Sequence, residues 1–162
     1  MDPVSIAASI IAIGGFTTAS LKVILKVRGA SDEVQALINE ISDLSAIVKD
    51  VEDTVLHNRK ISTETPGFAT LCGALTRAKT TINHLHAFVN SVLIKEESML
   101  RNERISRTTW MKHKPQVSKY QRELLAVRTE LVQALGLANL YDDLPDIDID
   151  TYMLRRILGK PA

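Results

Sequence analysis

Three segments of the chain place apolar residues at intervals of three and four, the spacing that gathers them on one face of an α-helix. In the first segment the charged residues largely occupy the other faces. The pattern predicts three amphipathic helices that bury their apolar faces against one another. The three apolar series are Val34, Leu37, Ile41, Leu44, Val48, Val51 and Val55; Phe68, Leu71, Leu75, Ala78, Ile82, Leu85, Val89 and Val92; and Val117, Tyr120, Leu124, Val127, Leu131 and Leu135.

The N-terminal segment differs because it has no polar face. No charged residue occurs in the 19 positions from Pro3 to Leu21. We expect a helix from about Pro3 to Val27, followed by a stop at Gly29. Its apolar residues fall on several ridges. Large residues occupy two of them (Ile6, Ile10 and Ile13; Val4, Ile11, Leu21 and Leu25), and a flat third ridge consists of Ala8, Ala12, Gly15 and Ala19.

A helix that is apolar all round is surrounded either by protein or by lipid. Three interpretations are therefore open: a central core helix, a conditional or stable membrane element, and a cleaved targeting segment. The uncharged run is near the lower limit for spanning a bilayer of roughly 30 Å. Asp2 stands where a signal peptide would carry basic residues. In the soluble state we expect this helix to be the most buried one, packed by the three amphipathic helices.

The predicted fold is all-α and resembles a four-helix bundle, with a hydrophobic N-terminal helix and a short C-terminal helix. Residues 1–140 form the bundle, and residues 141–162 form an acidic linker and a helix over Thr151–Leu158. Thr65 and Pro66 suit the N-cap and first position of the third helix, which should end near Glu97. The segment from Ser98 to Lys114 should be irregular.

The net charge of +1 is unevenly distributed along the chain. Residues 1–58 carry −4, residues 59–114 carry +6 and residues 115–162 carry −1. The basic middle third suggests either a solvated connection between helices or a patch that binds anionic lipid, with the indole at headgroup level. Nucleic acid is not expected as a partner because no recognised binding motif accompanies the charge. The candidate lipid-binding residues are Arg101, Arg104, Arg107, Trp110, Lys112 and Lys114.

The sequence offers no convincing catalytic or metal-binding motif. Cys72 and His86 would lie roughly 21 Å apart on one helix, so they and His84 cannot share an ion. The acidic run Asp146–Asp150 lacks the glycine and glutamate of an EF-hand loop. We therefore expect no enzyme activity, metal or cofactor. A single cysteine excludes an internal disulfide and fits a reducing compartment.

Several stretches carry a family resemblance that covers roughly residues 1–140. They are the opening Met1-Asp-Pro-Val-Ser-Ile-Ala-Ala-Ser-Ile-Ile-Ala, Glu33-Val-Gln-Ala-Leu-Ile-Asn-Glu-Ile-Ser-Asp-Leu, and the series Trp110, Lys114, Tyr120-Gln-Arg-Glu-Leu-Leu and Leu135. The chain resembles the HeLo-like fungal N-terminal domains of STAND- and NACHT-type receptors. These are similar to the four-helix bundles of heterokaryon-incompatibility proteins and of the mixed-lineage-kinase-like necroptosis effector.

The resemblance implies a cytoplasmic domain that acts conditionally at the plasma membrane in fungal incompatibility or immune-type cell death. Its partners would be anionic lipids, other copies of itself and possible STAND-type receptors. The alternative is a soluble oligomerisation or adaptor domain without membrane activity. In the first case the small ridge should form the contact between inserted helices. The residues expected to insert are Val4, Ile6, Ile10, Ile11, Ile13, Phe16 and Leu21.

Overall fold

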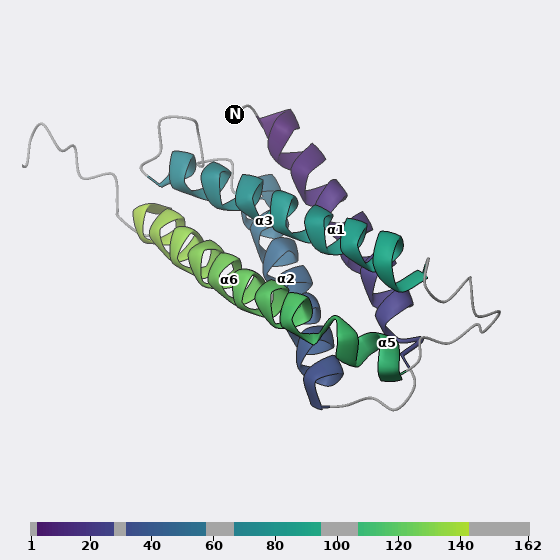
Figure 1. Cartoon of the computed structure of the whole chain (residues 1–162). Coiled ribbons are helices and arrows are strands. Elements are labelled where there is room, and N and C mark those ends of the chain that lie inside the picture. The colour runs from purple at the N-terminus through teal and green to yellow at the C-terminus, as the bar shows by residue number, and fades with distance from the viewer. Residues whose placement is uncertain (1–2, 28–31, 58–66, 95–106, 143–162) are drawn as a thin grey trace, which may run out of the picture.

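The computed structural model describes residues 3–27, 32–57, 67–94 and 107–142. Every regular element in these ranges is helical, which confirms the all-α prediction (Figure 1). The predicted helix over Thr151–Leu158 lies outside the described residues. The elements are α1 (Pro3–Ile24), α2 (Asp32–His57), α3 (Phe68–Phe88), the π-helix η1 (Val89–Ile94), α5 (Arg107–Lys112) and α6 (Lys114–Asp142).

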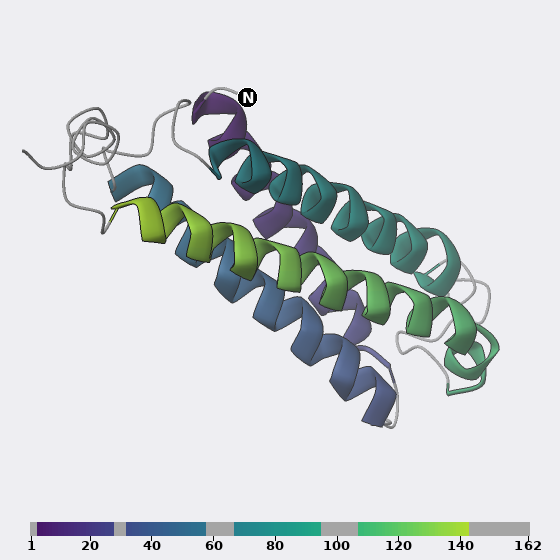
Figure 2. The same cartoon turned by 90° about the vertical axis from the view of Figure 1, so that its left-hand side faces the viewer.

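The four long helices alternate in direction along the chain, so α1 runs parallel to its neighbour α3 and antiparallel to its neighbour α2 (Figure 2). The helix α1 packs against α2 and α3, and α6 packs against the same two helices from the other side. Consequently α1 and α6 occupy opposite corners of the bundle. The predicted four-helix-bundle-like architecture is confirmed, but α1 is a corner of the bundle and not its centre.

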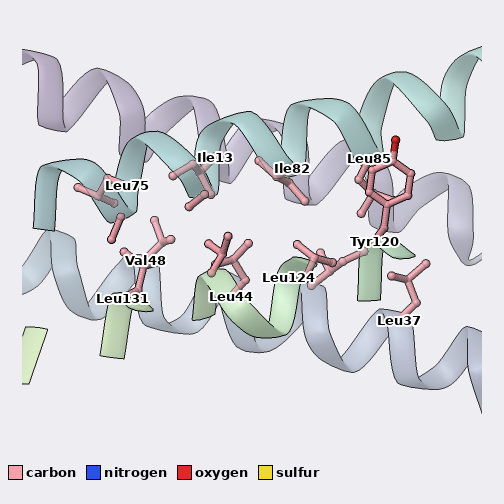
Figure 3. Packing of buried hydrophobic residues seen from close by; sticks show 14 of the residues in the cluster. Ile13, Leu37, Leu44, Val48, Leu75, Ile82, Leu85, Tyr120, Leu124 and Leu131 are labelled. Atoms are coloured by element: carbon pink, nitrogen blue, oxygen red, sulfur yellow. The ribbon is translucent and has the colours of Figure 1, made fainter. Parts of the chain in front are cut away.

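The core lies between the four helices, where the predicted apolar faces meet (Figure 3). Ile13 of α1, Leu44 of α2, Leu75 of α3 and Leu124 of α6 each have no exposed surface. Burying a side chain of this size stabilises the fold by about 1.5–3 kcal/mol. The predicted series on α2, α3 and α6 are buried, apart from Val55 and Leu135, which are partly buried, and Val92, whose side chain lies outside the described residues.

The helix boundaries have local causes. Asp32 and Glu33 occupy the first turn of α2, where carboxylates complement the helix dipole. The start of α3 is preceded by Gly67 at φ 91°, a left-handed conformation that favours glycine. This start lies beyond Thr65 and Pro66, and those two residues are outside the described part of the chain.

Two features differ from the sequence prediction near the basic segment. After Phe88 the backbone continues as the π-helix η1 over Val89–Ile94. Part of the segment expected to be irregular forms the short helix α5, and a turn at His113 separates it from α6. Pro115 does not interrupt a helix because it lies in the first turn of α6, where its missing N–H has no intrahelical partner to lose.

Polar side chains tie α6 to both of its neighbours. Arg128 of α6 forms ion pairs with Asp43 and, at 3.3 Å, with Glu40 of α2. Nearer the start of α6, Lys114 lies 2.5 Å from the carboxylate of Glu33. Gln121 donates a hydrogen bond of 2.9 Å to the backbone carbonyl of the same glutamate. The link to α3 is an ion pair of 2.5 Å between Arg77 and Glu130.

Candidate functional site

The helix α1 presents a buried face and, on its opposite side, an exposed face that is also largely apolar. We call the exposed face the outer stripe. Its large apolar members Val4, Ile11 and Leu25 have 77%, 73% and 67% of their surface exposed. The stripe repeats at intervals of four and three, so it forms one continuous band along the helix. Its members are Val4, Ala8, Ile11, Gly15, Thr18, Lys22 and Leu25.

The expectation that α1 would be the most buried helix was therefore wrong. Nine residues of α3 are buried and eight of α1, and 33% of the most apolar window of α1 is buried. Among the described residues, α1 is the one helix long and apolar enough to cross a membrane, with a mean hydropathy of 1.7 over Val4–Ile24. Length and composition of this kind also occur in core helices, so the exposure of the stripe is the more informative observation.

The residues predicted to insert into a membrane divide between the two faces of α1. Ile6, Ile10 and Ile13 are core residues, whereas Phe16 and Leu21 are partly buried. Only Val4 and Ile11 of that set face outward in this conformation.

The predicted small ridge shares Ala8 and Gly15 with the outer stripe, and Ala12 and Ala19 lie beside it. Ala8 and Gly15 are exposed, and Ala12 and Ala19 are partly buried. A methyl group added at Gly15 would meet no atom within 4 Å. The ridge is therefore available at the surface while α1 is still packed in the bundle.

The buried face of α1 is not wholly apolar. It includes the hydroxyls of Ser9, Thr17 and Ser20, all of them buried. Thr17 donates a hydrogen bond of 2.9 Å to the carbonyl of Gly14, but Ser20 Oγ has no hydrogen-bond partner. A buried polar group without a partner costs about 1–3 kcal/mol. The unpaired hydroxyl of Ser20 therefore makes the packing of α1 in the bundle less favourable.

The helix α1 also differs from the others in how it is attached. Among the described side chains of residues 6–24, the hydrogen bonds are internal to α1, from Thr17 and Thr18 to Gly14. Packing across to the neighbouring helices is apolar, with one contact between the rings of Phe16 and His86, whose centroids are 5.4 Å apart. The ion pairs that fix α6 have no counterpart in this part of α1.

A small open groove lies between α1 and α2, next to the outer stripe. Its volume is about 240 Å³, enough for an aliphatic side chain. Small residues on both helices, Gly14 and Ser45, create the space, and charged side chains stand at its rim. The lining residues are Ile10, Ile11, Ile13, Gly14, Ser45, Val48, Lys49 and Glu52.

Three of the six residues of the predicted anionic-lipid patch can be placed. Trp110 has only 1% of its surface exposed, so it is a core residue and cannot lie at headgroup level in this conformation. Lys114 is engaged with Glu33, and Lys112 is exposed but also has an interaction partner. Arg101 and Arg104 lie outside the described residues, as does the side chain of Arg107, which begins α5.

The structure provides little for catalysis or metal binding in the part of the chain that it describes. No group of three or more histidine, cysteine or acidic residues that could hold a metal is found there. Cys72 is buried in the core, and this burial raises the pKa of its thiol. A thiol with a raised pKa is a poorer nucleophile at neutral pH, since the thiolate is the reactive form.

Comparison with known proteins gives one result. A family model described as "Pigment biosynthesis cluster protein PigL N-terminal" matches residues 1–148, which include all four long helices. No curated protein and no solved structure matches the chain. The match supports the broader part of the resemblance noted above, a fungal N-terminal domain. Because the model covers most of the chain, the protein belongs to the PigL N-terminal family of fungal N-terminal domains.

Proposed function

We propose that this domain is a conditional membrane-binding bundle that acts through α1 in a fungal incompatibility or immune-type cell-death pathway. The observation that carries the proposal is the outer stripe, an exposed and largely apolar band on a helix without charge from Val4 to Leu21. The resemblance to HeLo-like domains supplies the pathway and the cytoplasmic setting. A STAND-type receptor would be the natural source of the activating signal.

The outer stripe allows a first contact with a bilayer that needs no unfolding. Val4 and Ile11 can enter the acyl boundary while Ile6 and Ile13 remain in the core. Lys22 lies at the C-terminal end of the stripe, where its long side chain can extend to the phosphate level of the headgroups. The single lysine gives a modest preference for anionic lipid, on the order of 1 kcal/mol.

Deeper insertion would require α1 to leave the bundle. Residues 6–24 form no ion pair or side-chain hydrogen bond to the other described helices, so this part of α1 is held by packing. Its departure would uncover Leu44 and Leu75, at roughly 25 cal/mol per Å² of apolar surface. We propose that self-association of the remaining helices offsets this cost, so insertion accompanies assembly on the membrane.

The test is binding to liposomes and release of an entrapped dye by the purified chain. Ile11→Asp places a charge on the outer stripe without touching the core, and should reduce liposome binding at least tenfold. Val132→Asp is the matched control, because Val132 on α6 is also exposed, at 52%. Circular dichroism checks that both variants are folded.

Two results would overturn the proposal. One is an absence of binding by the unaltered chain to vesicles with either neutral or anionic headgroups. The other is equal binding by the Ile11→Asp variant and the unaltered chain. Binding without dye release would retain the membrane contact and remove the permeabilising role. If the unaltered chain binds neither kind of vesicle, a soluble adaptor domain is the better description.

A further inference from the structure

We infer that the outer stripe is also an isologous interface, on which α1 packs antiparallel against α1 of a second copy of this chain. The inference concerns the protein in solution and does not depend on membrane binding. It rests on the spacing of the stripe, on the groove beside it and on the positions of charged side chains at its ends.

The spacing of the outer stripe suits another helix. Val4, Ala8, Ile11, Gly15 and Thr18 alternate intervals of four and three, as do the buried series on α2 and α3. Such a repeat keeps one face directed at a neighbouring helix over several turns. Ala8 and Gly15 let two backbones approach closely, while Ile11 supplies apolar area to bury.

The groove between α1 and α2 adds a place for a protruding side chain. It lies immediately beside Ile11 and is floored by Ile10 and Val48. A side chain from an opposing helix can enter it as a knob enters a hole. The neighbouring Gly14 leaves the entrance open, since a methyl group there would meet no atom within 4 Å.

The charges near the outer stripe favour an antiparallel orientation of the two α1 helices in the dimer. Lys22 and Lys26 are exposed near the C-terminal end of α1, and neither has an ion-pair partner among the described residues. Glu52 stands at the groove rim, toward the N-terminal half of α1. In an antiparallel pair the lysines of one copy come next to Glu52 of the other, twice by symmetry. A parallel pair would instead place the two sets of lysines side by side.

Lys49 also lines the groove and lies one turn before Glu52 on α2. It is close to the middle of α1, so the antiparallel arrangement brings it near neither Lys22 nor Lys26 of the other copy. A single helix face on each copy is small for an interface, below the roughly 1,200 Å² of stable complexes. We therefore expect a dissociation constant on the order of 10 µM.

Sedimentation equilibrium of the full chain without lipid, over about 1 to 300 µM protein, tests the inference. The unaltered chain should show a monomer–dimer equilibrium. Ile11→Asp should weaken dimerisation at least tenfold, and Val132→Asp should leave it within twofold. Lys22→Glu and Glu52→Lys should each weaken it, whereas the double variant should restore it to within about threefold.

Cross-linking tests the orientation directly, in chains that carry Cys72→Ala. Val4→Cys alone should give no disulfide-linked dimer. A mixture of the Val4→Cys chain and the Leu25→Cys chain should give the mixed dimer. Monomeric behaviour at every concentration, self-linking of Val4→Cys, or an equal effect of Val132→Asp would each overturn the inference. All of these samples lack lipid. Their results therefore test dimerisation separately from the proposed binding to liposomes.

Discussion

Ile13 and Ile11 lie two positions apart on α1, yet Ile13 is completely buried and Ile11 has 73% of its surface exposed. The same side chain therefore stabilises the bundle at one position and forms an exposed surface at the other. Replacing Ile13 with alanine should lower the free energy of unfolding by about 2–5 kcal/mol, because it leaves a cavity in the core. Ile11→Ala should change it by less than about 0.5 kcal/mol.

Urea denaturation of the two variants under conditions that keep the chain monomeric measures this difference. Equal destabilisation by both substitutions would show that Ile11 is covered in solution, and would contradict its exposed position. The comparison thus checks the most important feature of α1 before any membrane is added.

Trp110 is the single tryptophan of the chain, so its fluorescence reports on one site. Because it is buried, the native protein should emit at short wavelength and resist quenching by acrylamide. Trp110→Ala should cost about 3–5 kcal/mol of stability. Emission typical of an indole in water, or protection that arises only when anionic vesicles are added, would restore the original interpretation of Trp110 as a surface anchor.

The charged cluster of Arg128 with Glu40 and Asp43 should matter more than the exposed pair of Arg77 and Glu130. The side chain of Arg128 is only 25% exposed and that of Glu40 is 22% exposed. Removing Arg128 leaves two carboxylates close together without their shared cation. We expect Arg128→Ala to destabilise the fold by about 1–2 kcal/mol, less than for a fully buried pair. Arg77→Ala should cost less than about 1 kcal/mol.

Thermal or urea unfolding at low and high salt distinguishes the two ion pairs. The contribution of Arg77 should shrink as salt rises, because exposed pairs are screened. The loss caused by Arg128→Ala should persist at high salt. Identical effects of the two alanine substitutions would mean that the cluster does not hold α6 against α2 more firmly than a surface pair would.

Cys72 provides a prediction about pH. Burial raises the pKa of its thiol above the ordinary value of 9.0, so the unfolded chain releases the proton first as pH rises. The stabilising contribution of the neutral buried thiol is fully present below about pH 8 and is lost as pH rises through the folded-state pKa. Cys72→Ala should remove this part of the decline.

The measurement is the free energy of unfolding between pH 7 and pH 10.5 for the two chains. Their difference should be constant up to about pH 8 and then change in favour of the alanine variant. Native Cys72 should also react slowly with a disulfide reagent, and faster once the chain is unfolded. A parallel pH dependence of both chains would show that the thiol titrates equally in the folded and unfolded states.

The buried faces of α2, α3 and α6 were predictable because their sequences alternate apolar and polar positions. Leu37, Leu75 and Leu124 could only face the core, since charged residues occupy other faces of their helices. The helix α1 lacked that constraint, so its pattern did not reveal which isoleucines turn inward. Lys22 was the residue that could have indicated the exposed face of α1. It lies on the same face as Val4 and Ile11, and its charge must remain in contact with water or headgroups.

Trp110 shows a second limit of prediction from the sequence pattern. Its neighbours in the sequence are basic, and that context suggested a surface. In the structure α5 lies at the start of α6, across the turn at His113, and Trp110 belongs to the same core cluster as Val117 and Tyr120. Such a contact depends on how one short helix meets another, and periodicity within a single segment does not record it. The ion pairs of Arg128 depend in the same way on the relative rotation of α2 and α6.

The π-helix after α3 affects how the chain tolerates changes in its length. A π-helix accommodates an extra residue within a helical turn. Removing one residue from Val89–Ile94 can convert this turn to ordinary α-helix, while the core residues of α3 before it keep their positions. In the middle of α6 the same deletion would rotate all later core positions by about 100°. Related genes should therefore gain or lose a single codon here more readily than within the long helices.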